Sequence, residues 1–86
     1  MPEISWFLGI KIEMFWGDHP PAHFHATYAG QSAQIGIAPF TVLAGKLPGK
    51  VIALIAEWVA LHEAELLEAF AKAARKEHPG KIEPLV

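Results

Sequence analysis

Apolar and polar residues alternate with a period of two through the first part of the chain. In residues 10–16 every second side chain is apolar, with Lys11 and Glu13 between them, and residues 4–8 alternate in the same way up to Gly9. This period is typical of strands with one face in a core, and a glycine between two such segments is a natural turn. The pattern predicts two neighbouring strands with apolar positions at Ile4, Trp6, Leu8, Ile10, Ile12, Met14 and Trp16.

A second strand pair is predicted around a two-residue turn at Ala29-Gly30. Such a turn fixes which residues of the two strands face each other, and both strands then agree on both faces of the sheet. The predicted pairs of this hairpin are Phe24 with Ile35, Ala26 with Ala33 and Ala22 with Ile37 on an apolar face, and His23 with Gly36, His25 with Gln34 and Thr27 with Ser32 on a polar face. Residues 39–45, which follow the hairpin, form either a short edge strand or a connecting loop.

The second half of the chain has the apolar spacing of an amphipathic helix. Pro48 suits a first helical turn, apolar residues recur with helical period through residues 51–73, and residues 78–80 are a stop signal. A straight helix over residues 48–77 would be about 45 Å long. A chain of this length folds to only about 30 Å across. We therefore expect a kink or break near residues 61–65.

One α+β domain over residues 1–86 is the predicted architecture. A small antiparallel sheet of three to five strands, residues 4–44, would present an apolar face, and the long or kinked C-terminal helix, residues 48–77, would cover it. Hydrophobic residues make up 52% of the chain, which is high for so small an interior, so apolar surface should be left over. That surplus predicts a homo-oligomer or a stable protein partner.

Charge and targeting features narrow the functional classes. The net charge is -2, so general electrostatic attraction does not support nucleic acid as a partner. The absence of cysteine fits a reducing compartment. The N-terminus has no basic run ahead of an apolar segment, and charged residues interrupt the apolar stretches. These features predict a cytoplasmic protein with neither a secretory signal nor a membrane span.

Residues 18–25 hold three of the five histidines and one carboxylate. His23 and His25 would project from the same face of a strand with Cα atoms about 6.6 Å apart, close enough for both to bind one metal ion. His19 is the natural third ligand, provided that a turn folds it back. Asp18 could be a fourth ligand, an acceptor that orients an imidazole, or only the residue that starts the turn. Gly36, opposite His23, would leave an open space for a ligand.

Three interpretations of this cluster stay open at the level of sequence. The histidines could be ordinary polar residues on the exposed face of a hairpin. They could bind a divalent transition metal, zinc or nickel, through His19, His23, His25 and Asp18. They could instead work without a metal, with His23 and His25 as the acid and base of an RNA-cleaving enzyme and Asp18 beside them. Residues that could support such a site from further out are Gln34, Glu57 and His62.

The run from Gly17 to Ala26, GDHPPAHFHA, resembles the signature of DUF4160, a bacterial family of small proteins. Leu47-Pro48, residues 57–62 and residues 65–67 are similar to further parts of that signature. The resemblance implies no reaction, but genes of this family often stand beside those of another small family, DUF2442, in an arrangement like a toxin–antitoxin module. It therefore implies a partner protein of the DUF2442 type. A toxin–antitoxin-type interaction or regulatory module is the first expected function, a metal-binding protein the second, and a metal-independent RNase the third.

Overall fold

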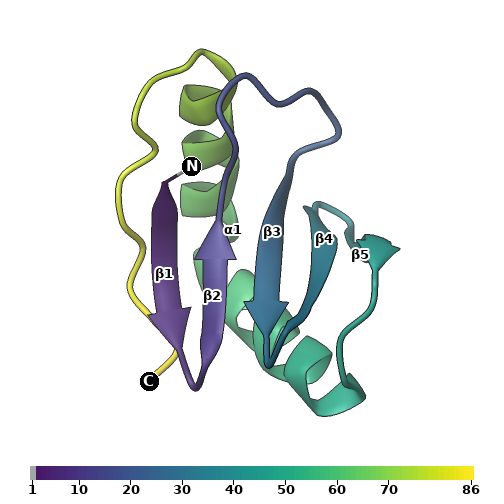
Figure 1. The fold of residues 1–86 in the computed structure, drawn as a ribbon. Helices are drawn as coiled ribbons and strands as arrows, with labels where there is room; N and C mark the ends of the chain where they lie inside the picture. Colours follow the sequence, from purple (N-terminus) through teal and green to yellow (C-terminus); the bar gives the residue numbers. More distant parts are fainter. Residues whose placement is uncertain (1) are drawn as a thin grey trace.

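The computed structural model describes residues 2–86, and Met1 lies outside the described part. Five strands form one antiparallel sheet in which each strand pairs with its neighbour in the sequence, and one long helix runs behind that sheet (Figure 1). The predicted α+β class is therefore confirmed. The elements are β1 (Glu3–Phe7), β2 (Ile10–Glu13), β3 (His23–Tyr28), β4 (Gln31–Ile37), β5 (Phe40–Gly45) and α1 (Gly49–Ala74).

The β3–β4 hairpin has the predicted register. Ala29 and Gly30 both have positive φ angles, of 48° and 80°, as a two-residue turn that matches the strand twist requires. Phe24 faces Ile35 and His25 faces Gln34 in the sheet. The apolar side chains of these strands are buried, so the alternation read from the sequence does place one face of the hairpin in the core.

The first hairpin is confirmed, but its predicted apolar face is wrong in part. The register of β1 shifts within residues 3–5, and such a bulge turns the following side chains to the opposite face. Phe7 is therefore buried, whereas Trp6 and Leu8 are more than half exposed. Trp16 is exposed as well, because the chain has left the sheet before it reaches this residue.

Residues 40–45 form the edge strand β5 rather than a loop. β5 pairs with β4, and a register shift leaves Leu43 as an extra residue in the strand. Every residue of β5 after Phe40 is exposed, including the apolar Val42 and Leu43. One edge of the sheet therefore presents uncharged side chains and backbone groups that no strand in residues 2–86 covers.

The helix α1 is kinked, as its length predicted. His62 has non-helical backbone angles (φ -129°, ψ 22°) within the helix. A straight helix of 26 residues would measure about 39 Å, longer than the 32 Å that the molecule spans along its longest axis. The kink keeps both halves against the sheet, where they bury Val51, Ile55, Trp58, Val59, Leu66, Ala69, Phe70 and Ala73.

The C-terminal segment covers the other edge of the sheet. It runs beside β1 (Figure 1), where the Ile82 N–H donates a hydrogen bond to the Ile4 carbonyl at 2.8 Å. The indole N–H of Trp58, at the centre of the core, donates to the Glu83 carbonyl at 2.8 Å.

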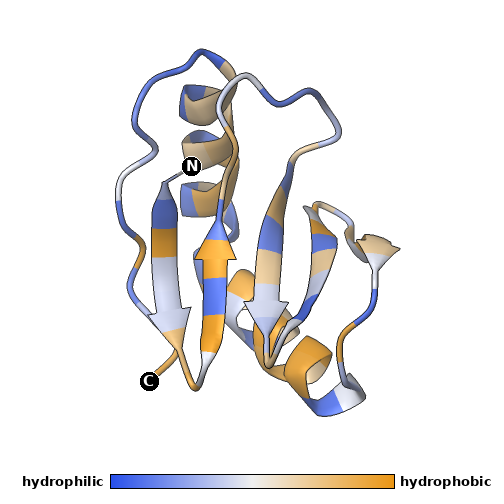
Figure 2. Cartoon of the chain, in the orientation of Figure 1, coloured by the Kyte–Doolittle hydropathy of each residue, from blue (hydrophilic) through white to orange (hydrophobic). Residues whose placement is uncertain are grey.

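Figure 2 shows the hydropathy of the residues along the chain, and apolar and polar residues alternate along β2. No helix in residues 2–86 is both long and apolar enough to cross a membrane.

Candidate metal centre

The loop between β2 and β3 carries Asp18 to the start of β3. Gly17 has a φ of 70°, and its N–H donates to the Ala73 carbonyl at 2.9 Å, at the C-terminal end of α1. This bond ties the loop to the helix. The Asp18 carboxylate then accepts a hydrogen bond from the His19 backbone N–H at 3.1 Å, which helps to fix its direction. A contact between residues more than fifty positions apart in the sequence therefore positions Asp18.

His23, the first residue of β3, is buried, with only 5% of its surface exposed. Its Nδ1 lies 2.7 Å from the Pro21 carbonyl oxygen, and its Nε2 lies 2.9 Å from Asp18 Oδ2. The ring also packs against Phe70 of α1, with ring centroids 5.4 Å apart. The predicted placement of His23 on an exposed polar face is thus wrong, because the loop and the helix end enclose this end of the strand.

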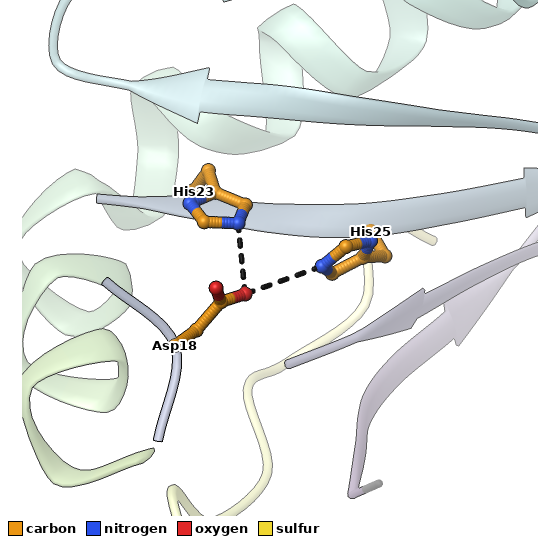
Figure 3. Close-up of side chains that lie close together, drawn as sticks. All are labelled: Asp18, His23 and His25. Atoms are coloured by element: carbon orange, nitrogen blue, oxygen red, sulfur yellow. Dashed lines mark hydrogen bonds and ion pairs between the residues drawn. The ribbon is translucent and has the colours of Figure 1, made fainter. Parts of the chain in front are cut away.

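His25 lies two residues after His23 on β3 and close to the same carboxylate oxygen. Its Nε2 lies 3.4 Å from Asp18 Oδ2, and the two histidine rings have centroids 5.3 Å apart. Phe15 stacks flat on the His25 ring at a centroid distance of 3.7 Å and an interplanar angle of 9°, which restricts the ring's orientation. Figure 3 shows both rings pointing at Asp18 from one strand.

These three side chains form a donor set of suitable size for one metal ion. One ligand atom from each of Asp18, His23 and His25 lies within 4.8 Å of the other two. Donors at about 2.0–2.1 Å from a tetrahedral zinc ion are about 3.4 Å apart, and the two histidine nitrogens lie 2.9 and 3.4 Å from Asp18 Oδ2. Two imidazoles and one carboxylate suit zinc, nickel and iron alike.

The hydrogen bond of His23 Nδ1 to Pro21 determines which form of the ring faces Asp18. The Pro21 carbonyl can only accept a hydrogen bond, so Nδ1 carries a hydrogen. If the ring is neutral, Nε2 then presents a lone pair to a carboxylate oxygen at 2.9 Å, and those two groups repel each other. A second proton on the ring or a cation bound between the two atoms removes that repulsion.

The Asp18 carboxylate is held in its charged form. Partial burial raises its pKa, but hydrogen bonds from His25 and from the His19 backbone, together with the charges of His23 and His25, outweigh burial and lower the pKa below its ordinary value. Asp18 is therefore ionised at neutral pH, as a metal ligand must be.

The structure does not bring all of the predicted site residues together. His19 is exposed, and its Nδ1 donates to the Pro20 carbonyl at 3.1 Å, outside the three-residue group. Gln34 lies beside His25, and both line a shallow hollow on the outer face of the sheet. Glu57 is exposed on α1, and His62 pairs with Glu65 at 2.7 Å at the kink.

The open space expected opposite His23 is also absent. A Cβ added to Gly36 would lie 3.0 Å from Thr41 Cγ2 and 3.6 Å from Leu43 Cγ, so side chains of β5 fill that position. The site residues expected from the sequence did not include Phe15, Pro21 or Phe70, which contact the two rings. Phe15 is the one of these residues that the sequence could indicate. It lies two residues after the end of β2, so strand alternation would place it on the polar face of β2.

Comparison with known proteins gives one match. The family model for a domain of unknown function, DUF4160, covers residues 9–71, which include the whole Asp18, His23 and His25 group and most of α1. The search of curated proteins and the search of solved structures each gave no match.

Proposed function

The chain belongs to the DUF4160 family, and we propose that this member binds one divalent transition-metal ion through Asp18, His23 and His25. The Nε2 of the buried His23 carries the proposal. The other ring nitrogen, Nδ1, already donates to a carbonyl, and Nε2 faces a carboxylate oxygen at 2.9 Å. An ion bound between them would accept the lone pair and neutralise the carboxylate. The Nδ1 bond to Pro21 would then orient the ring, as outer hydrogen bonds commonly do for metal-binding histidines.

His25 adds a third ligand to the pair formed by His23 and Asp18. In the metal-free protein its Nε2 donates a hydrogen bond to the Asp18 carboxylate. The second imidazole points at the same oxygen at 3.4 Å and is held there by Phe15. Convergence of two imidazoles on one carboxylate oxygen is the arrangement that a shared ion stabilises. Three protein ligands also leave one coordination position for water or a substrate, as in catalytic zinc sites.

Calorimetric titration with zinc and with nickel tests this proposal. We expect one ion per chain at about pH 7.5 and weaker binding at about pH 5.5, because acid protonates the imidazoles that must bind the ion. Asp18→Asn, which keeps the side-chain shape, and the double variant His23→Ala/His25→Ala should lose binding. His19→Ala is the matched control, since it removes an exposed histidine from the same loop. Equal uptake by the wild type and the double variant would exclude these ligands.

We propose a second role, as a protein-interaction module, because of the uncovered edge strand β5. The C-terminal segment covers the β1 edge through Ile82, whereas residues 40–45 of β5 are without charge and expose Val42 and Leu43. Natural sheets usually protect such edges with charged residues, proline or bulges, and β5 has only the bulge at Leu43. An edge strand without charge or proline can accept a strand from another protein. The DUF2442-type partner expected from the family resemblance is the first occupant to test.

Coexpression with a DUF2442-type protein, followed by copurification, tests the interaction. Val42→Lys/Leu43→Lys should abolish the complex, because it places two charges on the edge that would be paired. Leu61→Lys, at an exposed position of α1, should leave the complex intact. A complex that tolerates the β5 change would place the contact elsewhere. Loss of growth inhibition on coexpression would further support a toxin–antitoxin-type role.

The metal-independent RNase has the least support from the geometry. A base or acid for RNA cleavage must reach its substrate within hydrogen-bond distance. His23 is 5% exposed and both of its ring nitrogens face protein acceptors. This alternative stays a prediction.

A further inference from the structure

We infer that Lys76 binds a phosphate group that occupies the open coordination position of the metal proposed above. The inference rests on the proposed metal function and names the chemical class of its ligand. Its basis is the placement of one lysine side chain across the loop that carries Asp18.

The C-terminal end of α1 turns with Lys76 in a left-handed conformation. The Lys76 N–H donates to the Ala73 carbonyl at 2.9 Å and the Glu77 N–H donates to the Lys72 carbonyl at 2.8 Å, while Lys76 has a φ of 63°. This pair of bonds is the common helix-ending motif in which glycine is preferred at the left-handed position. A lysine there costs stability, and strain of this kind often accompanies a function of the side chain.

The Lys76 side chain points to the metal-site loop. A Cβ built on Gly17 would lie 3.3 Å from Lys76 Cε, so the last carbons of the lysine cross the residue next to Asp18. Two further contacts join the same parts: the Gly17 N–H bonds to Ala73, and the Trp16 and His78 rings lie 6.1 Å apart edge to face. The left-handed turn therefore places Lys76 Cε beside Gly17, the residue that precedes Asp18.

Lys76 also differs from the other cations of this region in having no acidic partner. Within residues 2–86, Lys72 pairs with Glu68, and Arg75 and Lys81 pair with carboxylates of their own, but no carboxylate within 4.0 Å pairs with Lys76. Its charge is thus available to an external anion.

The charges favour an anion at this position. A divalent ion bound by one carboxylate and two neutral imidazoles keeps one positive charge, and Lys76 adds a second. A phosphate can place one oxygen on the metal and another on the ammonium group, which is a common way for lysine to bind phosphate. Loss of a charge-assisted contact of this kind corresponds to about tenfold weaker binding.

Cobalt(II)-loaded protein provides the test, because cobalt bound to nitrogen and oxygen ligands has a visible spectrum that changes when a ligand replaces water. Cobalt uptake is measured first and inorganic phosphate is then titrated. We expect phosphate to change the spectrum of the wild type, Lys76→Met to bind phosphate about tenfold more weakly with unchanged cobalt affinity, and Lys76→Arg to restore binding. Lys50→Met, at the opposite end of α1, is the matched control and should behave as the wild type.

Lys76→Gly gives an independent readout. Glycine suits the left-handed position, so this variant should have a higher melting temperature than the wild type and yet bind phosphate as weakly as Lys76→Met. Phosphate affinity that is unchanged in both variants would overturn the role of Lys76 while leaving the metal site intact. Failure to take up cobalt would overturn the proposed metal function, and this inference with it.

Discussion

At the scale of single residues, the two hydrogen-bond acceptors around His23 matter most. The Pro21 carbonyl oxygen lies 2.7 Å from Nδ1 and an Asp18 carboxylate oxygen lies 2.9 Å from Nε2, and His23 itself is buried. Buried polar groups are expected to be fully paired, and a neutral imidazole cannot donate to both acceptors. A neutral ring that donates from Nδ1 therefore presents its Nε2 lone pair to the Asp18 carboxylate, and a cation bound between these two atoms would satisfy both.

The lowered pKa of Asp18 predicts how the stability of the metal-free protein depends on pH. A carboxyl group whose pKa is lower in the folded than in the unfolded chain stabilises the fold above its ordinary pKa, and that contribution is lost as the pH falls through the folded value. Urea unfolding of chelator-treated protein should therefore show the wild type losing more stability than Asp18→Asn as the pH falls from about 6 to about 3. Parallel pH profiles for the two proteins would contradict this effect.

Phe15 should influence metal affinity without touching the ion. Its ring stacks on His25 at 3.7 Å and so limits the rotation of a ligand. Phe15→Leu should weaken zinc binding by about tenfold, in the range seen when supports of a ligand are removed. Phe15→Tyr keeps the stacked ring and should bind zinc as the wild type does. Calorimetry on the three proteins checks this, and equal affinities would mean that the strand alone orients His25.

At the scale of elements, the sequence could predict the sheet register and the helix kink because each has a simple physical cause. Two faces of the β3–β4 hairpin agree only in one register, and a straight α1 would be longer than the molecule. The face of β1 could not be predicted. Residues 4–8 are apolar except for Ser5, so the alternation did not show that a bulge would bury Phe7 instead of Trp6.

Trp58 should be the most important side chain for joining the helix to the sheet. It is fully buried, packs against Phe7 and Phe24, and donates its indole N–H to Glu83 in the C-terminal segment. Trp58→Ala should lower the free energy of unfolding by about 3–5 kcal/mol in denaturant melts. Trp58→Phe retains most of the packing and should cost less. A loss below about 1 kcal/mol for the alanine variant would be inconsistent with a core position.

At the scale of the whole molecule, the site depends on contacts that no local pattern contains. Strand periodicity placed His23 and His25 on one side of β3, but the sequence favoured His19 as their third partner. The fold instead brings Asp18 to them, because the Gly17 N–H bonds to Ala73 at the distant end of α1. The same helix end buries His23 with Phe70. Such long-range enclosure appears only when sheet and helix are assembled.

The location of a bound ion is the most direct test of the proposed metal site. Crystals grown with zinc, with diffraction recorded on both sides of the zinc absorption edge, would locate the ion through its anomalous signal. We predict a peak at about 2.0–2.2 Å from Asp18 Oδ2, His23 Nε2 and His25 Nε2, with His23 Nδ1 still bonded to Pro21. With excess zinc present, no anomalous peak at this cluster and a direct hydrogen bond between His23 and Asp18 would contradict a metal site at these residues.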